Sequence, residues 1–424
     1  MTIHARSDRR FIRSAHRSER FVLVELEAPP SPRRAQRDPL NVAFVIDRSG
    51  SMSGSKLDLA RRAVETAVER LLPTDRFAVI AYDDQIDVVV ESTPASREAK
   101  AMAVDRLRTI DARGSTNLGE GWLRGAEQVA QAQAATTGAS VNRVLVLTDG
   151  LANQGMTDPV ELTRHAAELR LRGITTTTFG VGEDFDESLL QSMSDAGGGH
   201  FYFIADASQI IDQIASEVGE MLDVVARDAT VEVTAPDGLG VTVDSLSRFP
   251  VEVRGNRWLV RLGDLVAEQR LEVVLRVRFG YGTIGQEVGM LVGVSDREGA
   301  LVAGGFAPVP VGWQYADNPT NDAQPRDRSV DRLVARLFAA RARQEAVQLN
   351  RRGSYDAARS AVHSVARRIA AYADGDAELG TVVAELAADE QRWAAPAPEM
   401  SRKVAFASAN YTMRSRGPEG RASR

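Results

Sequence analysis

The sequence predicts an α/β fold, in which a doubly wound, mostly parallel sheet is followed by an antiparallel β domain and a C-terminal helical module. Three observations predict it. Strand-like and helical patterns alternate between residues 41 and 222, the hydrophobic period changes to two after residue 226, and apolar residues recur at helical spacing after residue 328. With 424 residues, 43% hydrophobic and 26% charged, the chain is long enough for two or three domains.

The first 40 residues predict a basic tail followed by one strand. The run 21–27 alternates as a strand and stops at the proline-rich connector 28–32, which no helix or central strand can cross. This strand must pair in the next domain or in a later one. Without interleaved aromatic residues, we expect the basic tail to be a solvated segment and not a nucleic-acid site. Its arginines are Arg6, Arg9, Arg10, Arg13, Arg17 and Arg20.

Between 41 and 222, strands and helices follow each other with short connections, as in a doubly wound sheet. The helix expected at 56–72 carries one apolar stripe and stops at Pro73. Its N-terminus points at the preceding loop, where the helix dipole favours an anion or a carboxylate. The expected strands are 42–46, 76–82, 86–90, 143–148, 174–181 and 200–204, and the expected helices are 56–72, 96–109, 119–136, 158–172, 186–195 and 207–222.

The rest of the chain predicts two smaller parts. Short alternating runs separated by Gly, Pro and Asp indicate an antiparallel, sandwich-like β domain at 226–313. A polar stretch at 314–328 reads as a linker. Apolar residues at i, i+3, i+4, i+7 and i+8 then predict a helical hairpin or bundle at 328–394, and residues 395–424 read as a second tail.

Three loops that follow apolar strands carry the strongest functional pattern. They are Asp47-Arg48-Ser49-Gly50-Ser51, Gly114-Ser115-Thr116-Asn117-Leu118 and Thr148-Asp149-Gly150. Parallel sheets bind ligands beyond the carboxyl ends of their strands, so we expect these loops to converge there. Magnesium needs only a few protein oxygens and keeps waters, which makes this a candidate Mg²⁺ site. The candidate ligands are Asp47, Ser49, Ser51, Thr116 and Asp149.

Only two of these five side chains carry charge, so an open position on the ion would accept a carboxylate from a partner protein. Arg48 and Met52 alternate with the ligands, and we expect them to point outward and set partner specificity. Trp122, on the helix after Thr116, is expected to be a core residue, although a surface contact role is the alternative.

Enzymatic functions fit these three loops less well. An aspartyl-phosphate phosphatase needs a second carboxylate two residues after its nucleophile, and Ser49 stands there. The string 50–56 resembles a phosphate loop. However, its glycines are four residues apart instead of five, and Leu57 follows the lysine where a phosphate loop has Ser or Thr. A Mg²⁺-dependent hydrolase needs a general base near Asp47, and the nearest carboxylates, Asp83 and Asp84, are better explained as turn caps or supporting groups. We therefore expect no enzymatic activity.

Residues 41 to about 222 resemble a von Willebrand factor type A domain. Asp47, Ser49 and Ser51 match its Asp-x-Ser-x-Ser motif, Thr116 its lone threonine and Asp149 its distal aspartate. The resemblance implies a metal-ion-dependent adhesion site that holds Mg²⁺ or Mn²⁺ and binds an acidic side chain of a protein partner. The order of the parts is also similar to bacterial relatives of inter-α-trypsin inhibitor heavy chains and calcium-activated chloride channel regulators.

The expected function is metal-dependent protein–protein interaction by a bacterial adaptor or scaffold. The alternative is a subunit of a complex driven by a MoxR-type ATPase that acts on a client protein, which genomic neighbourhood would distinguish. The absence of cysteine excludes disulfides and thiolate chemistry and fits the cytoplasm. No apolar run approaches the roughly 20 residues that span a bilayer.

Overall fold

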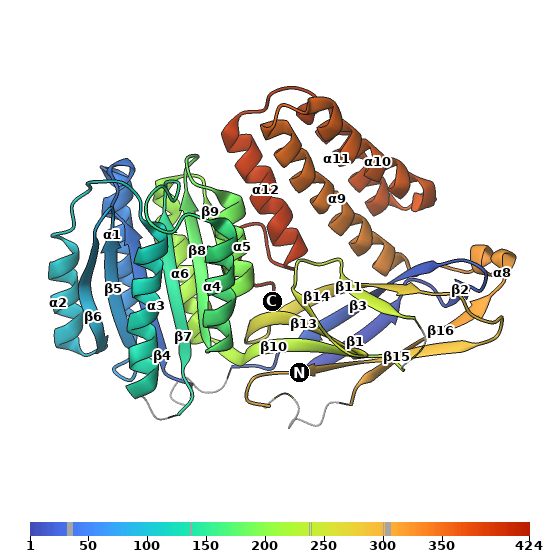
Figure 1. Cartoon of the computed structure of the whole chain (residues 1–424), viewed down its shortest axis with the longest axis horizontal. Coiled ribbons are helices and arrows are strands. Elements are labelled where there is room, and N and C mark those ends of the chain that lie inside the picture. The colour runs from blue at the N-terminus through green and yellow to red at the C-terminus, as the bar shows by residue number, and fades with distance from the viewer. Residues whose placement is uncertain (32–36, 136–137, 237, 239, 300, 302–306) are drawn as a thin grey trace. The chain divides into compact units, whose positions relative to one another are not determined.

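The computed structural model describes residues 1–31, 37–135, 138–236, 238, 240–299, 301 and 307–424 (Figure 1). Residue 32 of the expected connector and residue 136 of the expected helix 119–136 lie outside this part of the chain. Contacts divide the chain into two compact units. One consists of Ser31–Val225, and the other combines Met1–Pro30 with Ala226–Arg424.

The unit Ser31–Val225 is built on a six-stranded sheet in the order β6-β5-β4-β7-β8-β9. Strands β5, β4, β7, β8 and β9 run parallel, and only the edge strand β6 is antiparallel to its neighbour β5. This confirms the predicted mostly parallel sheet. The strands are β4 (Leu40–Asp47), β5 (Arg76–Tyr82), β6 (Ile86–Pro94), β7 (Val141–Thr148), β8 (Ile174–Val181) and β9 (Gly198–Ile204).

Helices cover both faces of this sheet (Figure 1). Successive side chains of a strand point to opposite faces. Val42, Phe44 and Ile46 of β4 join the core beneath α1, α2 and α6, whereas Ala43 and Val45 lie next to Gly125 of α3 on the other face. The helices are α1 (Ser55–Glu69), α2 (Arg97–Leu107), α3 (Leu118–Ala135), α4 (Pro159–Leu171), α5 (Glu187–Gly197) and α6 (Ile210–Leu222).

Gly125 lets α3 approach the sheet closely. A Cβ atom at this position would lie 2.4 Å from Cγ2 of Val45, closer than real Cβ contacts allow. We expect Gly125→Ala to destabilise this unit by about 1–3 kcal/mol, because the core is overpacked. The control is Gly219→Ala in α6, where an added Cβ meets nothing within 4 Å and better helix propensity should stabilise by about 0.5–1 kcal/mol. Urea unfolding of both variants tests this, and equal stabilities would contradict it.

The second unit contains two sheets, in the orders β1-β3-β14-β11 and β12-β13-β10-β15-β16-β2. The pairing of β3 with β14 runs from Ser18 opposite Phe279 to Glu27 opposite Arg270, so the N-terminal strand belongs to the later β domain. The strands are β1 (Thr2–Ser7), β2 (Phe11–Arg13), β3 (Ser18–Glu27), β10 (Val224–Thr234), β11 (Thr242–Ser245), β12 (Val251–Arg254), β13 (Arg257–Val266), β14 (Arg270–Phe279), β15 (Glu287–Ser295) and β16 (Val309–Ala316).

The helices of this unit share a core with its first sheet. Phe21 of β3 and Val274 of β14 pack in one cluster with Leu333 of α9 and Met413 of α12. Apolar residues of α9 recur every three or four positions, which places them on the side of the helix that faces the strands. The helices are α8 (Asn318–Ala323), α9 (Arg328–Arg351), α10 (Tyr355–Ala373), α11 (Ala377–Trp393) and α12 (Glu399–Met413).

The predictions of a tail at each end of the sequence are wrong. Residues 1–20 contain β1, β2 and the start of β3, and several of their arginines have partners within the unit: Arg6 donates to Glu25 at 2.6 Å, and Arg20 is 4% exposed. Residues 395–424 contain α12, whose Ala409 and Met413 are core residues. The arginine content of residues 1–20 suggested a solvated tail, but several of these arginines have partners within the unit.

The prediction of a polar linker at 314–328 is also wrong. Strand β16 continues to Ala316, with Trp313 and Tyr315 buried on alternate positions, and α8 occupies Asn318–Ala323. The indole of Trp313 lies 4.9 Å from the Phe279 ring, between centroids, and completes the aromatic part of the β core. Every helix in the described ranges is too short or too polar to span a bilayer.

Candidate metal centre

The site begins at the carboxyl end of β4. This strand pairs in parallel with β5 and β7 on its two sides, and all eight of its residues are buried. Asp47 is its last residue and is 0% exposed, so the surrounding strands fix its carboxylate at the edge of the sheet. A short 3-10 helix at Gly50–Met52 turns the chain back before α1 begins at Ser55. The first loop is therefore held between a central strand and a helix.

Hydrogen bonds join the three predicted loops. The Gly50 N–H donates to the Gly114 carbonyl at 3.2 Å, which connects the first loop with the second. The Thr116 N–H donates to Oδ1 of Asn153 at 3.0 Å, and the Asn153 N–H donates to the Thr116 carbonyl at 3.1 Å. The second loop is therefore fixed to the segment that follows Asp149. Backbone contacts bring together loops about 65 and 30 residues apart in the sequence.

The side chains of the first and third loops form a continuous set of contacts. The Ser49 N–H donates to Oδ1 of Asp47 at 2.8 Å, and the Oγ atoms of Ser49 and Ser51 lie 3.1 Å apart. The Ser51 hydroxyl donates to Oδ1 of Asp149 at 2.6 Å. Thr148 donates its hydroxyl to Oδ2 of Asp47 at 2.6 Å. The two carboxylates are thus linked through Ser49 and Ser51, and Thr148 binds the other oxygen of Asp47.

Thr116 completes the group from the second loop. A Cβ atom built on Gly150 would lie 3.2 Å from Oγ1 of Thr116 and 3.7 Å from Oγ of Ser51, so the two hydroxyls lie on the same side of the third loop. The structure therefore brings all five predicted residues together. Asp47, Ser49, Thr116 and Asp149 are buried, whereas Ser51 is exposed and marks where the group reaches the surface.

The electrostatics of the site fit a cation. The pKa of Asp47 is raised to about 6: burial is the main cause, the hydrogen bonds from Thr148 and Ser49 oppose it, and the nearby Asp149 carboxylate adds to it. Within the described residues, no ion pair connects Asp47 to a basic side chain. Asp149 instead contacts the ammonium of Lys56, a cation already attracted to this group. An all-oxygen donor set with two carboxylates suits a hard divalent cation.

Residues 41–217 match the family model of the von Willebrand factor type A domain. This segment is a von Willebrand factor type A domain. The match contains the sheet and all five candidate ligands, as the sequence motif predicted. A type A domain implies, in general, metal-dependent protein–protein interaction through a divalent ion at its adhesion site.

Similar proteins occur in bacteria and in animals. The chain is 31% identical over 219 residues to the uncharacterized protein YfbK of Escherichia coli (strain K12), an alignment that covers 51% of this chain and 37% of YfbK. It is 28% identical over 275 residues to inter-alpha-trypsin inhibitor heavy chain H1 of Mesocricetus auratus, with coverage of 58% and 30%. The expected similarity to such heavy chains is confirmed. The aligned segments span about a third of the length of these two relatives.

Two solved structures share the fold beyond the type A domain. A von Willebrand factor type A protein from Catenulispora acidiphila superposes with a TM-score of 0.67 at 20% identity, covering 87% of this chain and 88% of that one. The ArnB paralog VWA2 from Sulfolobus acidocaldarius superposes with a TM-score of 0.61 at 16% identity, covering 98% of both chains. At these identities the likeness concerns the fold alone.

Arg48 and Met52 do not point outward, so this prediction is wrong. Met52 is 0% exposed and belongs to the core beneath α1. The Arg48 guanidinium is buried against Asp83 at 3.3 Å and also pairs with Asp87 at 2.5 Å. The 3-10 turn at Gly50–Met52 breaks the assumed alternation at Met52, whereas the two aspartates hold Arg48 inside. Neither side chain is positioned to select a partner of the type A domain.

Asp83 supports the metal face without joining the ligands. Its carboxylate pairs with Arg48 and with Arg113, and its carbonyl accepts from the Asn117 N–H at 2.8 Å. Burial raises the pKa of Asp83, but hydrogen bonds from the Gln85 N–H, Arg113 and Arg48 outweigh it and hold the pKa below its usual value. Asp83 thus ties the first loop to the second, in agreement with the supporting role expected from the sequence.

Three further residues of the site were not identified from the sequence. The sequence motif includes Thr148 only as part of the third loop, although its position directly before Asp149 places it at the end of β7, beside Asp47. Asn153 supports Thr116 through its side chain, for which the sequence carries no signal. In the sequence, Lys56 stands out only as part of the string 50–56 that resembles a phosphate loop. In the structure its ammonium contacts Asp149.

Trp122 and His200 are structural residues. Trp122 is 0% exposed and donates to Oγ1 of Thr176 at 3.1 Å, which confirms its core position. His200, Glu217 and Glu220 lie close enough to hold a metal. However, Oε1 of Glu217 accepts from Arg143 at 2.6 Å, and its Oε2 accepts from Tyr202 at 2.7 Å. A basic partner already neutralises Glu217, so we interpret the group as a buried ion-pair network.

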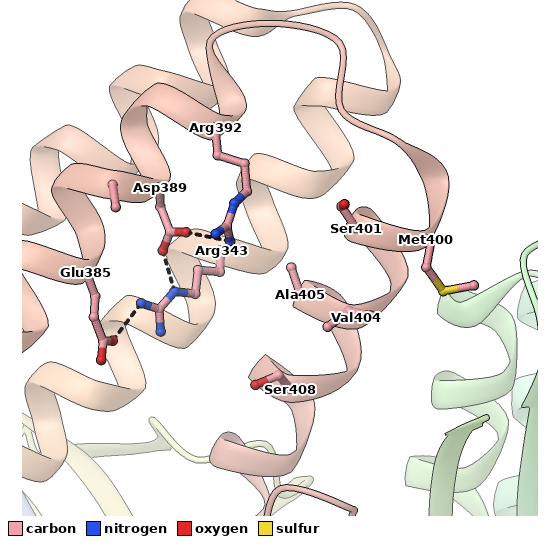
Figure 2. A pocket seen from close by; sticks show the side chains of 10 residues that line it. Arg343, Glu385, Asp389, Arg392, Met400, Ser401, Val404, Ala405 and Ser408 are labelled. Carbon is pink, nitrogen blue, oxygen red and sulfur yellow. Dashed lines mark hydrogen bonds and ion pairs between the residues drawn. The ribbon is translucent and has the colours of Figure 1, made fainter. Parts of the chain in front are cut away.

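A pocket of about 570 Å³ lies in the helical module, among residues of α9, α11 and α12 (Figure 2). Its charged side chains face one another: Arg343 pairs with Asp389 at 2.6 Å and with Glu385 at 2.9 Å, and Arg392 pairs with Asp389 at 3.1 Å. Small and apolar residues of α12, such as Ala405 and Val404, form the opposite wall. The balanced charges favour no particular ligand.

Proposed function

We propose that this chain binds Mg²⁺ or Mn²⁺ at Asp47, Ser49, Ser51, Thr116 and Asp149, and uses the site to bind an acidic side chain of a partner protein. The observation that carries the proposal is the meeting of two buried carboxylates and three hydroxyls from three loops, with Ser51 at the surface. When bound, the ion supplies a Lewis-acidic position for a carboxylate oxygen. We propose a binding role and no catalytic one.

The residues of the chain divide this task. Asp47 offers a buried carboxylate held by the Ser49 N–H and the Thr148 hydroxyl, so its oxygens are oriented before any ion arrives. Burial of such a charge is costly without a partner, which favours a cation at this position. Ser51 and Thr116 provide neutral oxygens, so a divalent ion would keep positive charge to offer a partner carboxylate. The absence of cysteine supports a reducing compartment, and we propose the cytoplasm.

Titration calorimetry of the purified chain with Mg²⁺ and with Mn²⁺ tests the metal part of the proposal. Thr116→Val is expected to weaken ion binding by at least about tenfold, the scale of loss seen even for groups that only support a ligand. Thr116→Ser keeps the hydroxyl and is expected to bind within about threefold of the wild type by the same argument. Equal affinities of the valine and serine variants would show that Thr116 is no ligand.

The adhesion part needs a partner assay. Proteins crosslinked to the purified chain in Mg²⁺ would be identified, purified and retested for direct binding in Mg²⁺, in chelator and with Asp47→Ala. We expect binding to require both the ion and Asp47, and to disappear when an acidic residue at the crosslinked surface of the partner becomes an amide. Direct binding that persists in chelator would contradict the proposed mode of interaction.

A further inference from the structure

Lys56 is an unusual residue for this chain, which contains three lysines and otherwise uses arginine for positive charge. It is the second residue of α1. Its ammonium pairs with Oδ2 of Asp149 and lies 3.4 Å from the Ser51 carbonyl, so it contacts two of the five site residues. The Lys56 side chain is 30% exposed, whereas that of Asp149 is 0% exposed.

The position of Lys56 needs an explanation, because the first turn of a helix disfavours positive charge. Asp58, the acidic residue in the same turn, pairs with Arg61. Asp149 therefore provides the compensating charge for Lys56. With Ser51 donating to Oδ1 and Lys56 to Oδ2, both oxygens of Asp149 have partners from the chain itself. At Asp47, by contrast, the hydrogen bonds from the part of the chain that the structure describes come only from Ser49 and Thr148.

We propose that Lys56 is a built-in competitor for the divalent ion: its ammonium holds Asp149 while no ion is bound, and ion binding displaces it into solvent. This inference rests on the proposed metal-binding function. A lysine suits the role because its compact charge sits on a flexible four-carbon stem, whereas the planar fork of an arginine would hold a carboxylate through two bonds. Its partial exposure gives the ammonium a route to water.

Competition with Lys56 has two consequences for the site. Part of the affinity of the site is used to displace the ammonium, so Lys56 sets the ion concentration at which the site fills. A monovalent cation brings no more charge than the ammonium that it replaces, whereas a divalent cation brings twice as much. Lys56 therefore favours divalent over monovalent ions. It also keeps Asp149 neutralised, and the loops ordered, before an ion binds.

Amine labelling tests the displacement directly, because the other two lysines serve as references. Lys100 on α2 donates to the carbonyls of Glu69 and Leu71, and the Lys403 side chain is 1% exposed. The wild-type chain would be acetylated briefly in increasing Mg²⁺, and each lysine quantified by mass spectrometry. We expect labelling of Lys56 to rise several-fold as the ion binds, with Lys100 unchanged. Constant or reduced labelling of Lys56 across a titration that shows ion binding would overturn the inference.

Three variants measure the effect on affinity by calorimetry. Lys56→Met is expected to bind Mg²⁺ about twofold to fivefold more tightly than the wild type, the scale of a partly exposed ion pair. Lys56→Arg should bind more weakly than the wild type, and Lys100→Met, which removes the same charge elsewhere, should not differ from it. Unchanged affinity of Lys56→Met would overturn the inference alone. If neither the wild type nor Lys56→Met binds Mg²⁺ or Mn²⁺, the proposed function fails as well.

Discussion

Replacing Asp47 with alanine is expected to abolish binding of Mg²⁺ and Mn²⁺, with a loss of affinity of at least about 100-fold. Asp47 is the buried carboxylate of the site that has no basic partner among the described residues, so no other group can replace its charge. Calorimetry with both ions measures the change. The melting temperature without ions should stay close to that of the wild type or rise, because the substitution removes a buried charge whose ionisation burial opposes.

Asp105→Ala provides the matched control for this prediction. It removes the same group from α2, where the Asp105 side chain is 80% exposed, and should leave ion affinity unchanged. If Asp47→Ala and Asp105→Ala both bind the ions with wild-type affinity, the five residues form loop structure only. The function would then have to be sought outside the metal centre.

Replacing Glu217 with alanine is expected to destabilise the type A domain by about 3–5 kcal/mol. The substitution leaves the Arg143 guanidinium, whose side chain is 2% exposed, without the carboxylate that accepts from it at 2.6 Å. It also removes the acceptor for Tyr202. Hydrogen exchange of peptides from β7 and α6 measures the effect, since these peptides report on this unit alone.

A double variant distinguishes the loss of charge pairing from simple loss of packing. The double variant Arg143→Met, Glu217→Leu replaces both charges with apolar groups and should be less destabilised than Glu217→Ala, because no charge remains buried and unpaired. A double variant that is as unstable as the single one would show that the network is not governed by charge pairing. Ion affinity should be unchanged in both variants, because neither residue lies among the ligands.

Much of the type A domain was predictable from the sequence because its signals are local. The strand ending at Asp47 is continuously apolar and is buried on both faces, and the stripe of α1 has one clear period. The ligands of the first and third loops follow from these elements, since parallel strands place their carboxyl ends at one edge of the sheet, whereas Thr116 comes from the loop between α2 and α3. Physical proximity of the loops was therefore a consequence of topology, which a single sequence can indicate.

The remaining features depend on partners distant in the sequence. Arg20 looked like part of a solvated tail, but its guanidinium donates to the Phe11 carbonyl at 2.9 Å inside the second unit. Arg48 alternates with the ligands and is expected at the surface, but Asp83, 35 residues further along the chain, pairs with its guanidinium and holds it inside. Lys56 and Asp149 are 93 residues apart, and nothing in either local sequence indicates their contact. In each case, a contact with a residue elsewhere in the chain determines where the side chain lies.

The division of the second unit between the two ends of the sequence has a consequence for protein synthesis. β3 ends at Glu27, but its partner β14 begins at Arg270, so about 240 residues must be made before the two can pair. At about 5–20 residues per second, this takes on the order of 10–50 s. During that time β3 exposes unpaired backbone groups and an apolar face while the type A domain completes its own sheet. The nascent chain therefore passes through a stage in which its middle is folded and its beginning is not, and protection of β3 by a chaperone at that stage would favour correct assembly.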